Sequence, residues 1–210
     1  MHKILFICHG NICRSPMAEF VMKKLVKDAS REAEFEIASA ATSTEEIGNP
    51  VYPPAKRKLA EHNISCAGKT ARQITRKDYE YYDHIVAMDH NNLRNLHRML
   101  GDDRMHKISL LMDYTARPGD VADPWYTGDF EATWQDVLEG CTCLLNELAK
   151  SRELGGVSHC VLKGSDALHQ GSLATLEGSW TASRGGVSRM NNSGAYRIQS
   201  SKFKIQFFEF

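Results

Sequence analysis

A cysteine and an arginine near the start of the chain have the spacing of a phosphate-binding site. Cys8 and Arg14 are separated by the five residues His9-Gly10-Asn11-Ile12-Cys13. A thiolate is a strong nucleophile, and a guanidinium group is a planar, permanent cation that can bind two phosphate oxygens at once. If the chain curls between them, its backbone N–H groups and the guanidinium surround one phosphoryl group. The pattern therefore predicts phosphoryl transfer through a cysteine.

The residues between and beside this pair suit the same role. Gly10 can adopt unusual backbone angles, the Asn11 amide can brace the loop, and the Ser15 hydroxyl can donate a hydrogen bond to the thiolate. Cys13 lies close enough to Cys8 for a reversible disulfide that protects the nucleophile, or it is a small packing residue; both roles stay open. The expected phosphate-binding loop comprises His9, Gly10, Asn11, Ile12, Cys13, Arg14 and Ser15.

The segments on either side of this loop are the elements that must position it. Ile4-Leu5-Phe6-Ile7 is an apolar run typical of a buried strand. From Pro16 to Asp28 apolar residues recur at helical spacing, which predicts a helix that starts with proline. A strand, a short loop and a helix N-terminus in this order aim backbone N–H groups at an anion and favour the ionised form of a thiol.

A second segment has the same cysteine–arginine spacing but lacks these surroundings. Cys66 and Arg72 are also separated by five residues, which include Gly68-Lys69-Thr70. No predicted strand precedes this segment, and the first glycine of a Walker A phosphate loop would fall at position 63, which is asparagine. We therefore interpret residues 66–72 as a structural connection.

Strand and helix patterns alternate through the rest of the first 154 residues. Thr75 can cap a short helical turn, and Asp89 or His90 can cap a helix that ends at Gly101. Further strands are expected at residues 34–39, 83–88 and 106–112, and further helices at 53–62, 90–100 and 130–154. Strands separated by helices predict an α/β fold of three layers, α/β/α, with a four-stranded parallel sheet that is doubly wound and flavodoxin-like. Ligands of such folds bind beyond the carboxyl ends of the strands, where the loops 8–15 and 113–130 would meet.

Composition and charge argue against several other classes of protein. The chain has 210 residues, with 26 Lys and Arg against 26 Asp and Glu, so neither a nucleic acid nor a membrane surface is expected as a partner. The first apolar run, Ile4–Ile7, follows three residues and is too short for the hydrophobic region of a signal peptide. No apolar segment approaches membrane-spanning length. The six cysteines lack the density of a disulfide scaffold, which favours a reducing, cytoplasmic location.

The composition changes after residue 154. Residues 155–210 hold eight of the fifteen glycines, repeated Gly-Ser pairs and three acidic residues. We expect a domain at residues 1–154 and a poorly ordered Gly/Ser-rich extension at 155–210. The alternative for the extension is that its terminal aromatic residues, 203–210, dock on the domain.

Metal ligands are not gathered in any recognisable pattern. Cys141 and Cys143 lie two residues apart and therefore on different faces of a helix, and no set of four ligands emerges. Phosphoryl transfer through a thiolate requires no metal, so we expect neither a metal nor a cofactor.

The phosphate-loop residues and three later segments resemble one known family. The run Cys8-His9-Gly10-Asn11-Ile12-Cys13-Arg14-Ser15-Pro16-Met17-Ala18-Glu19 is similar to the signature of the low-molecular-weight protein tyrosine phosphatases. Asp123-Pro124-Trp125-Tyr126 resembles the general-acid loop of that family, and Ala71–Ile74 and Met88-Asp89 resemble family segments in the same order. The resemblance covers roughly residues 1–150.

The resemblance implies a role for each matching position. Cys8 would attack phosphorus and form a cysteinyl-phosphate, while Arg14 and the loop N–H groups hold the equatorial oxygens. Asp123 would protonate the departing phenolate and then activate the water that releases phosphate. Trp125 and Tyr126 would wall the pocket and stack on the substrate ring. The substrate would be a phosphotyrosine-containing protein or a small aryl phosphate.

Support and wall positions show both matches and departures. Ser39 matches a family serine that supports Asn11. Where the family often has a histidine in this support network, the chain reads Gly68-Lys69-Thr70. The wall position Glu45 is acidic where the family is often aromatic, which could alter substrate choice. His9 is expected at the rim and not as a base.

Three alternative functions share this pattern of residues. Arsenate reductases have the same loop, but they need further cysteines placed to pass on a disulfide, and Cys66, Cys141 and Cys143 show no such arrangement. Protein-arginine phosphatases tend to have threonine where this chain has Ile12. A non-catalytic phosphate-binding module would have lost Cys8 or Asp123, and both are present. The sequence favours a protein-tyrosine phosphatase and indicates neither its physiological substrate nor its oligomeric state.

Overall fold

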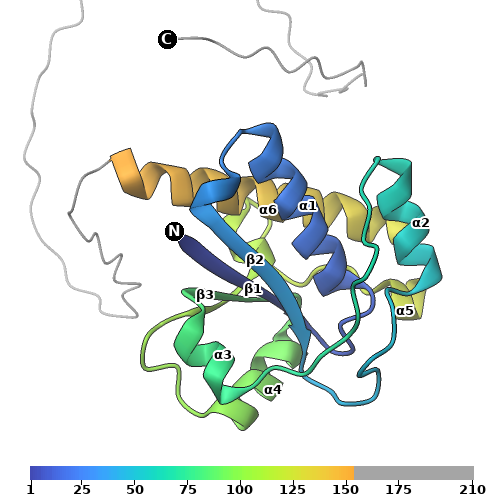
Figure 1. The fold of residues 1–210 in the computed structure, drawn as a ribbon. Helices are drawn as coiled ribbons and strands as arrows, with labels where there is room; N and C mark the ends of the chain where they lie inside the picture. Colours follow the sequence, from blue (N-terminus) through green and yellow to red (C-terminus); the bar gives the residue numbers. More distant parts are fainter. Residues whose placement is uncertain (154–210) are drawn as a thin grey trace, which may run out of the picture. The chain divides into compact units, whose positions relative to one another are not determined.

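The computed structural model of the chain describes residues 1–153 (Figure 1). The extension predicted for residues 155–210, and the alternative that it docks on the domain, lie outside the described residues. None of the helices within residues 1–153 is long and apolar enough to cross a membrane.

Four parallel strands form the central sheet, as the alternation of patterns predicts. The strand order is β2-β1-β3-β4, with β1 in the interior between β2 and β3. The chain leaves β1 to one side to build β2 and then crosses to the other side to build β3, so the switch in direction lies at β1. In doubly wound sheets this point marks the ligand crevice. The strands are β1 His2–Cys8, β2 Phe35–Ala41, β3 His84–Ala87 and β4 Ile108–Leu110.

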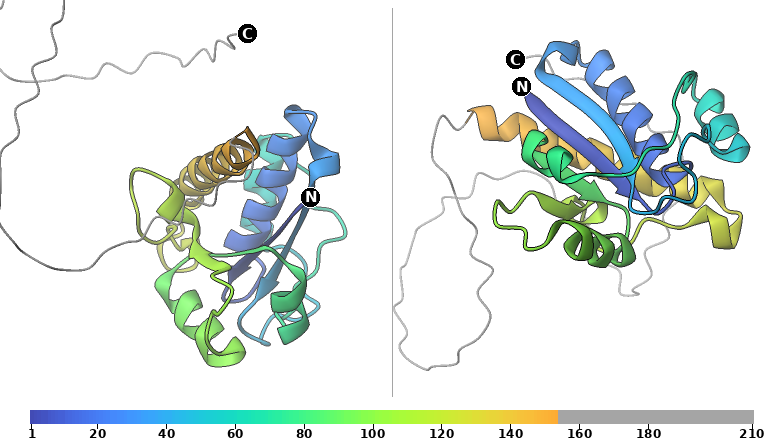
Figure 2. Two further views of the ribbon diagram at one scale, coloured as in Figure 1. Left: turned by 90° about the vertical axis from the view of Figure 1, so that its left-hand side faces the viewer. Right: turned by 60° about the horizontal axis from the view of Figure 1, so that its bottom comes forward.

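Helices cover both faces of the sheet (Figures 1 and 2). Helices α1 and α6 lie against one face with α2 beside them, and α3 and α4 lie against the other. The described α-helices are α1 Arg14–Asp28, α2 Pro53–Glu61, α3 Arg76–Tyr81, α4 His90–Leu100, α5 Pro124–Thr127 and α6 Phe130–Glu153. Two short 3₁₀ helices, Glu32–Glu34 and Leu111–Tyr114, complete the set.

The alternation of side chains along β1 divides the core between the two faces. Ile4 and Phe6 belong to the cluster under α1 and α6, and Leu5 and Ile7 belong to the cluster under α3 and α4. All four are fully buried, and burial of a side chain of this size contributes about 1.5–3 kcal/mol. Cys8 continues the first set and lies on the α1 side. Period-two alternation thus fixes which face receives the cysteine.

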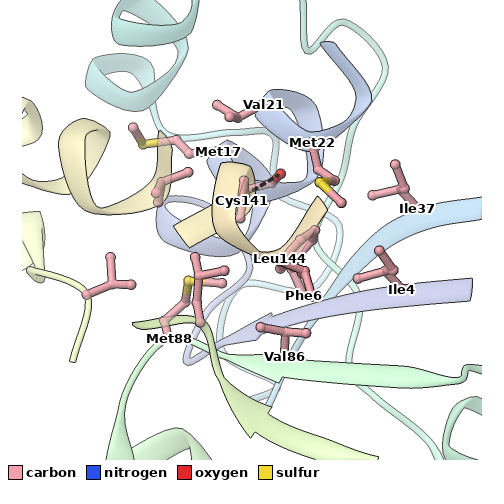
Figure 3. Close-up of a cluster of buried hydrophobic side chains, with 14 of the residues drawn as sticks. Ile4, Phe6, Met17, Val21, Met22, Ile37, Val86, Met88, Cys141 and Leu144 are labelled. Atoms are coloured by element: carbon pink, nitrogen blue, oxygen red, sulfur yellow. Dashed lines mark hydrogen bonds between the residues drawn. The ribbon is translucent and has the colours of Figure 1, made fainter. Parts of the chain in front are cut away.

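Helix α6 closes the first cluster. Its apolar stripe includes Cys141 and Leu144, which lie among side chains of α1 and the sheet (Figure 3). The Cys141 thiol donates a hydrogen bond to the Ala18 carbonyl at 3.7 Å. A side chain at Gly140 would place Cβ 2.5 Å from Cγ of Leu111. Glycine at this position therefore permits α6 to pack closely against the 3₁₀ helix Leu111–Tyr114.

Several element boundaries differ from the sequence-based expectations, and each difference has a local cause. The strand expected at residues 106–112 is only Ile108–Leu110, because Leu111 and Met112 continue into a 3₁₀ helix whose side chains are buried. A short apolar run is compatible with either conformation. Helix α1 begins at Arg14, two residues before Pro16, which occupies the first turn, where the missing N–H costs no hydrogen bond. The expected loop 113–130 contains the short helix α5.

The capping predictions agree with the structure. Thr75 and Asp78 form a reciprocal capping box at the start of α3. Asp89, not His90, caps α4, and its side chain accepts a hydrogen bond from the Asn92 backbone. Gly101 ends α4 with φ of 86°, a conformation that favours glycine.

Candidate active site

The first cysteine–arginine segment curls around its own thiol at the carboxyl end of β1. Cys8 is the last residue of the strand and is buried. The Asn11 backbone N–H donates to Cys8 Sγ at 3.3 Å, and Ser15 Oγ lies 3.1 Å from the same sulfur. Asn11 has φ of 56°, so the chain turns back through a left-handed residue before α1 begins. The Asn11 N–H and the Ser15 hydroxyl thus converge on the sulfur and fix its position at the end of the strand.

Two carboxylates hold the buried Arg14 guanidinium beside this loop. Arg14 Nη1 lies 2.6 Å from Asp89 Oδ2, and Nη2 lies 2.6 Å from Asp123 Oδ2. Burial acts to lower the pKa of Arg14, but the negative charges of Cys8, Asp123 and Asp89 outweigh burial and raise it. The guanidinium is therefore a fixed cation whose plane is set from two sides.

Asp89 is a site residue that the sequence reasoning did not assign to the site. One of its oxygens, Oδ1, accepts from the Asn92 N–H at 2.6 Å as the cap of α4, and the other contacts Arg14. The signal in the sequence was its position directly after the third strand, at the edge where ligands of such sheets bind. Its capping role and its contact with the arginine come from the same carboxylate.

Asp123 is positioned by a loop that is fixed on both of its sides. The carboxylate caps α5 and accepts from the Trp125 N–H at 3.0 Å, which leaves its second oxygen for the arginine. The Val121 N–H donates to the Met88 carbonyl at 2.8 Å, which joins the loop to the end of β3. The Ala122 N–H donates to Asp136 of α6 at 3.0 Å. The loop predicted from residues 113–130 therefore meets the phosphate loop at the sheet edge.

A chain of buried hydrogen bonds supports Asn11 from below. Its side-chain amide nitrogen donates to Ser15 Oγ at 2.9 Å and to Ser39 Oγ at 2.8 Å. Its amide oxygen accepts from the Arg72 N–H at 3.2 Å, and Ser39 Oγ donates to Glu19 at 2.6 Å. The structure thus brings together the three predicted support residues and adds Glu19 to them. The full set holds a left-handed asparagine in place next to the thiol.

Lys69 enters this network at the segment where the resemblance lacks its histidine. Its Nζ lies 3.2 Å from Glu19 Oε2 and donates to the Ser39 carbonyl at 3.0 Å. Burial lowers the pKa of Lys69, and the charge of Glu19 opposes that shift. Glu19 and Lys69 form a largely buried ion pair, so the segment Gly68-Lys69-Thr70 contributes a lysine to the support network.

A cavity of about 260 Å³ opens above the thiol and the guanidinium. Asn11 and Ser15 lie beneath it and do not line it, which suits support of the loop better than contact with a ligand. Trp125 and Tyr126 stand at its mouth, 61% and 85% exposed. The Trp125 ring lies 5.7 Å from the ring of Tyr52, a contact that sequence reasoning did not anticipate. The lining residues are Cys8, His9, Gly10, Ile12, Cys13, Arg14, Glu45, Glu46, Asp123, Trp125 and Tyr126.

Cys13 differs from Cys8 in its electrostatic surroundings. Burial, and then the charges of Cys8 and Asp123, raise the pKa of Cys13 to about 12. Cys13 is therefore a neutral thiol at physiological pH and is a poor nucleophile. Both cysteines are free thiols in the structure, so the disulfide between them stays a prediction.

The described part of the chain holds no group of three or more His, Cys, Asp or Glu side chains arranged to bind a metal ion. The geometry suits a dianion held by a thiolate loop and an arginine, with a carboxyl group within reach of a leaving group.

Comparison with known proteins gives a consistent result. Residues 3–154 match the family described as low molecular weight phosphotyrosine protein phosphatase. The chain is 38% identical over 156 residues to the low molecular weight protein-tyrosine-phosphatase YfkJ of Bacillus subtilis, covering 73% of this chain and all of that protein. It is 41% identical over 149 residues to the low molecular weight phosphotyrosine protein phosphatase of Rattus norvegicus, covering 69% and 94% of the two chains. The crystal structure of YfkJ matches with a TM-score of 0.70, covering 72% of this chain and 97% of that one.

Proposed function

Since the chain belongs to the low molecular weight phosphotyrosine protein phosphatase family, we propose that it hydrolyses phosphotyrosine in proteins, and small aryl phosphates, through a cysteinyl-phosphate intermediate. It is accordingly a phosphoric monoester hydrolase. The observation that carries the assignment of roles is the placement of Arg14 between Asp89 and Asp123 beside the thiol of Cys8.

In the first step the Cys8 thiolate attacks phosphorus. The S–P bond forms as the P–O bond to the tyrosine oxygen breaks, and the electron pair leaves on that oxygen. The loop N–H groups and Arg14 bind the three equatorial oxygens, where negative charge must be stabilised during transfer. Ser15 and the Asn11 N–H hold the sulfur in place for the attack.

The leaving oxygen requires a proton, because the conjugate acid of phenolate has a pKa of about 10 and phenolate leaves poorly without help. Asp123 lines the cavity and supplies this proton. In the second step the Asp123 carboxylate takes a proton from water as the water oxygen attacks phosphorus. The S–P bond then breaks, phosphate forms, and the Cys8 thiolate is restored.

The chain's own residues supply the nucleophile, the acid and the cation, so we propose that turnover is independent of a metal ion. The aromatic side chains of Trp125 and Tyr126 at the cavity mouth support an aryl substrate. The nucleophile must stay reduced, which supports action in a reducing compartment such as the cytoplasm.

The test is hydrolysis of p-nitrophenyl phosphate and of phenyl phosphate in the presence of a metal chelator. Relative to the unmodified chain, C8S is expected to lose turnover by about 10⁴-fold or more, because the nucleophile is gone. D123N is expected to lose about 10²–10⁴-fold with phenyl phosphate and less with p-nitrophenyl phosphate, whose leaving group needs a proton less.

Three results would contradict the proposal. Full activity of C8S would exclude the cysteinyl-phosphate, loss of activity in chelator would show that a metal takes part, and binding of phosphate without hydrolysis would indicate a binding module. The same preparations assayed with phosphoarginine, and with arsenate plus a thiol reductant, measure the two alternative activities of this fold. Phosphotyrosine is expected to give the highest kcat/KM.

A further inference from the structure

Two adjacent glutamates form part of the cavity mouth on the loop that follows β2. Glu45 and Glu46 both line the cavity that holds Cys8 and Arg14. Sequence reasoning singled out Glu45 as a wall residue but did not include Glu46. The mechanism described above uses neither, so their charges are available for another purpose.

This acidic segment is fixed to the phosphate loop. The Thr42 N–H donates to the Cys8 carbonyl at 3.0 Å, and the Ser43 N–H donates to the His9 carbonyl at 2.9 Å. The Cγ of Glu46 would lie 3.1 Å from a Cβ atom built at Gly10, so its side chain lies directly over the loop. The backbone that carries the two glutamates is therefore tied to the loop that would bind the phosphoryl group.

The charge of this rim is only partly neutralised. Glu45 Oε2 lies 3.1 Å from His9 Nε2, and the two side chains are 73% and 55% exposed. Glu46 accepts at 2.7 Å from the side-chain amide of Asn49, a neutral group. Arg14, the single Lys or Arg among the residues that line the cavity, is already engaged by two aspartates. The rim keeps net negative charge even when His9 is protonated.

We propose that Glu45 and Glu46 select phosphotyrosine segments that carry Lys or Arg next to the phosphotyrosine. This inference rests on the proposed function, because it names the substrate class of the same site. With the phosphotyrosine in the cavity, the neighbouring residues of the substrate lie at its mouth, where a cationic side chain pairs with the carboxylates. An acidic neighbour is repelled there, so the rim acts by attraction and by exclusion.

The experiment compares three phosphotyrosine peptides that differ only in the residues on either side of the phosphotyrosine: Lys, Gln or Glu. For the unmodified chain at neutral pH we expect kcat/KM to fall in the order Lys, Gln, Glu, with about a tenfold ratio between the first and the last at low salt. The ratio should shrink as salt is added, because exposed charges are screened. The peptide ratio within each enzyme is the readout, so changes in overall turnover cancel.

Two variants and a control locate the effect. The double variant E45Q/E46Q is expected to bring the ratio close to one, and E46K is expected to invert it. E32Q is the matched control. Glu32 is an exposed glutamate just before the start of β2, whereas Glu45 and Glu46 follow its end, so E32Q should leave the ratio of kcat/KM between the Lys and Glu peptides unchanged.

The outcomes separate this inference from the proposed function. Equal kcat/KM for the three peptides, or an unchanged ratio in both rim variants, would overturn the role of the rim while p-nitrophenyl phosphate is still hydrolysed. Absence of hydrolysis of every peptide and of p-nitrophenyl phosphate would overturn the proposed function itself, and the rim proposal with it.

Discussion

Residues 8–14 and 66–72 have the same cysteine–arginine spacing, and the structure places them in contact with each other. In the first segment the chain curls through Asn11 so that a backbone N–H reaches the thiol of Cys8. Its arginine is buried between two aspartates under a cavity. The spacing becomes a site because a strand ends at the cysteine and a helix begins at the arginine.

The second segment uses the same residue types for structural contacts. Cys66 is buried in the hydrophobic cluster that includes α1 and α6. Arg72 points to α3 and forms a two-pronged ion pair with Asp78, with N···O distances of 3.0 and 2.9 Å. Its backbone N–H donates to the side chain of Asn11. Residues 66–72 therefore support the loop at residues 8–14 and form no phosphate-binding loop of their own. The cysteine–arginine spacing alone does not make a catalytic site; the strand before it and the helix after it are also needed.

Exchange of each arginine for lysine tests this contrast most strongly. R14K keeps the charge but loses the fork that contacts both aspartates and the phosphate oxygens, so we expect kcat/KM for p-nitrophenyl phosphate to fall about 10²–10³-fold. R72K is the matched control and should change kcat/KM by a factor of about three or less. The contrast breaks if R72K loses as much activity as R14K at equal folded content, measured by circular dichroism.

Removal of the Lys69 cation measures how much the second segment supports the first. In K69M the buried Glu19 loses one of its two lysine partners and keeps Lys23, so we expect the free energy of unfolding to fall by about 2 kcal/mol. We expect kcat to fall by about fivefold, the equivalent of one lost hydrogen bond at Ser39. Urea denaturation and steady-state kinetics provide the two measurements.

Two further variants make the Lys69 result interpretable. K56M removes an exposed lysine from α2 and should leave both quantities close to those of the unmodified chain. E19Q/K69M removes both charges, so its free energy of unfolding should lie between those of K69M and the unmodified chain. If stability and kcat were both unaffected in K69M, the support by the second segment would have to run through Arg72 alone.

The smallest expected effect is the acid sensitivity of the Arg72–Asp78 pair. Burial acts to raise the pKa of Asp78, but its hydrogen bonds to Arg72 and Thr75 outweigh burial and lower it. A carboxyl group with a lowered pKa in the folded state stabilises the protein above its unfolded-state pKa of about 3.9, and this contribution is lost as the pH falls below that value. At neutral pH, R72M should therefore cost about 1 kcal/mol, discounted for partial exposure.

The measurement is thermal unfolding of the unmodified chain and of R72M across an acidic pH series. The difference in Tm between them should begin to shrink as the pH falls below about 4, where Asp78 of the unfolded chain takes up a proton, and it should vanish below the lowered pKa that Asp78 has in the folded, unmodified chain. A difference that stays constant with pH would show that Arg72 stabilises the protein through its backbone and aliphatic contacts.

Local signals in the sequence were sufficient to predict most of the fold. Thr75 with Asp78, and Asp89 before α4, are caps whose partners lie three residues away, so the pattern contains the whole interaction. The strand at Ile108–Leu110 was predicted too long because an apolar run does not distinguish a strand from a buried 3₁₀ turn. Resemblance, and not spacing, singled out Asp123 as the acid.

Residues of the site that escaped prediction have partners far away in the chain. Asp89 contacts Arg14 across 75 positions, and Lys69 contacts the Ser39 carbonyl across 30. No local periodicity encodes such pairs, because they exist only once parallel strands align their carboxyl ends. The burial of Glu19 had the weakest signal in the sequence, because a glutamate within a helix is usually exposed, and here it is buried.

Catalysis requires the correct register of β1, because side chains alternate between the two faces of the sheet. Cys8 shares its side of the sheet with Ile4 and Phe6, while Leu5 and Ile7 face α3 and α4. Deletion of one residue between Ile4 and Cys8 would turn the thiol toward α3 and α4, away from Ser15, or would force the apolar side chains to exchange faces. A molecule in which β1 has the wrong register cannot turn over substrate. The specific activity of a preparation is therefore proportional to the fraction of molecules in which β1 is correctly paired.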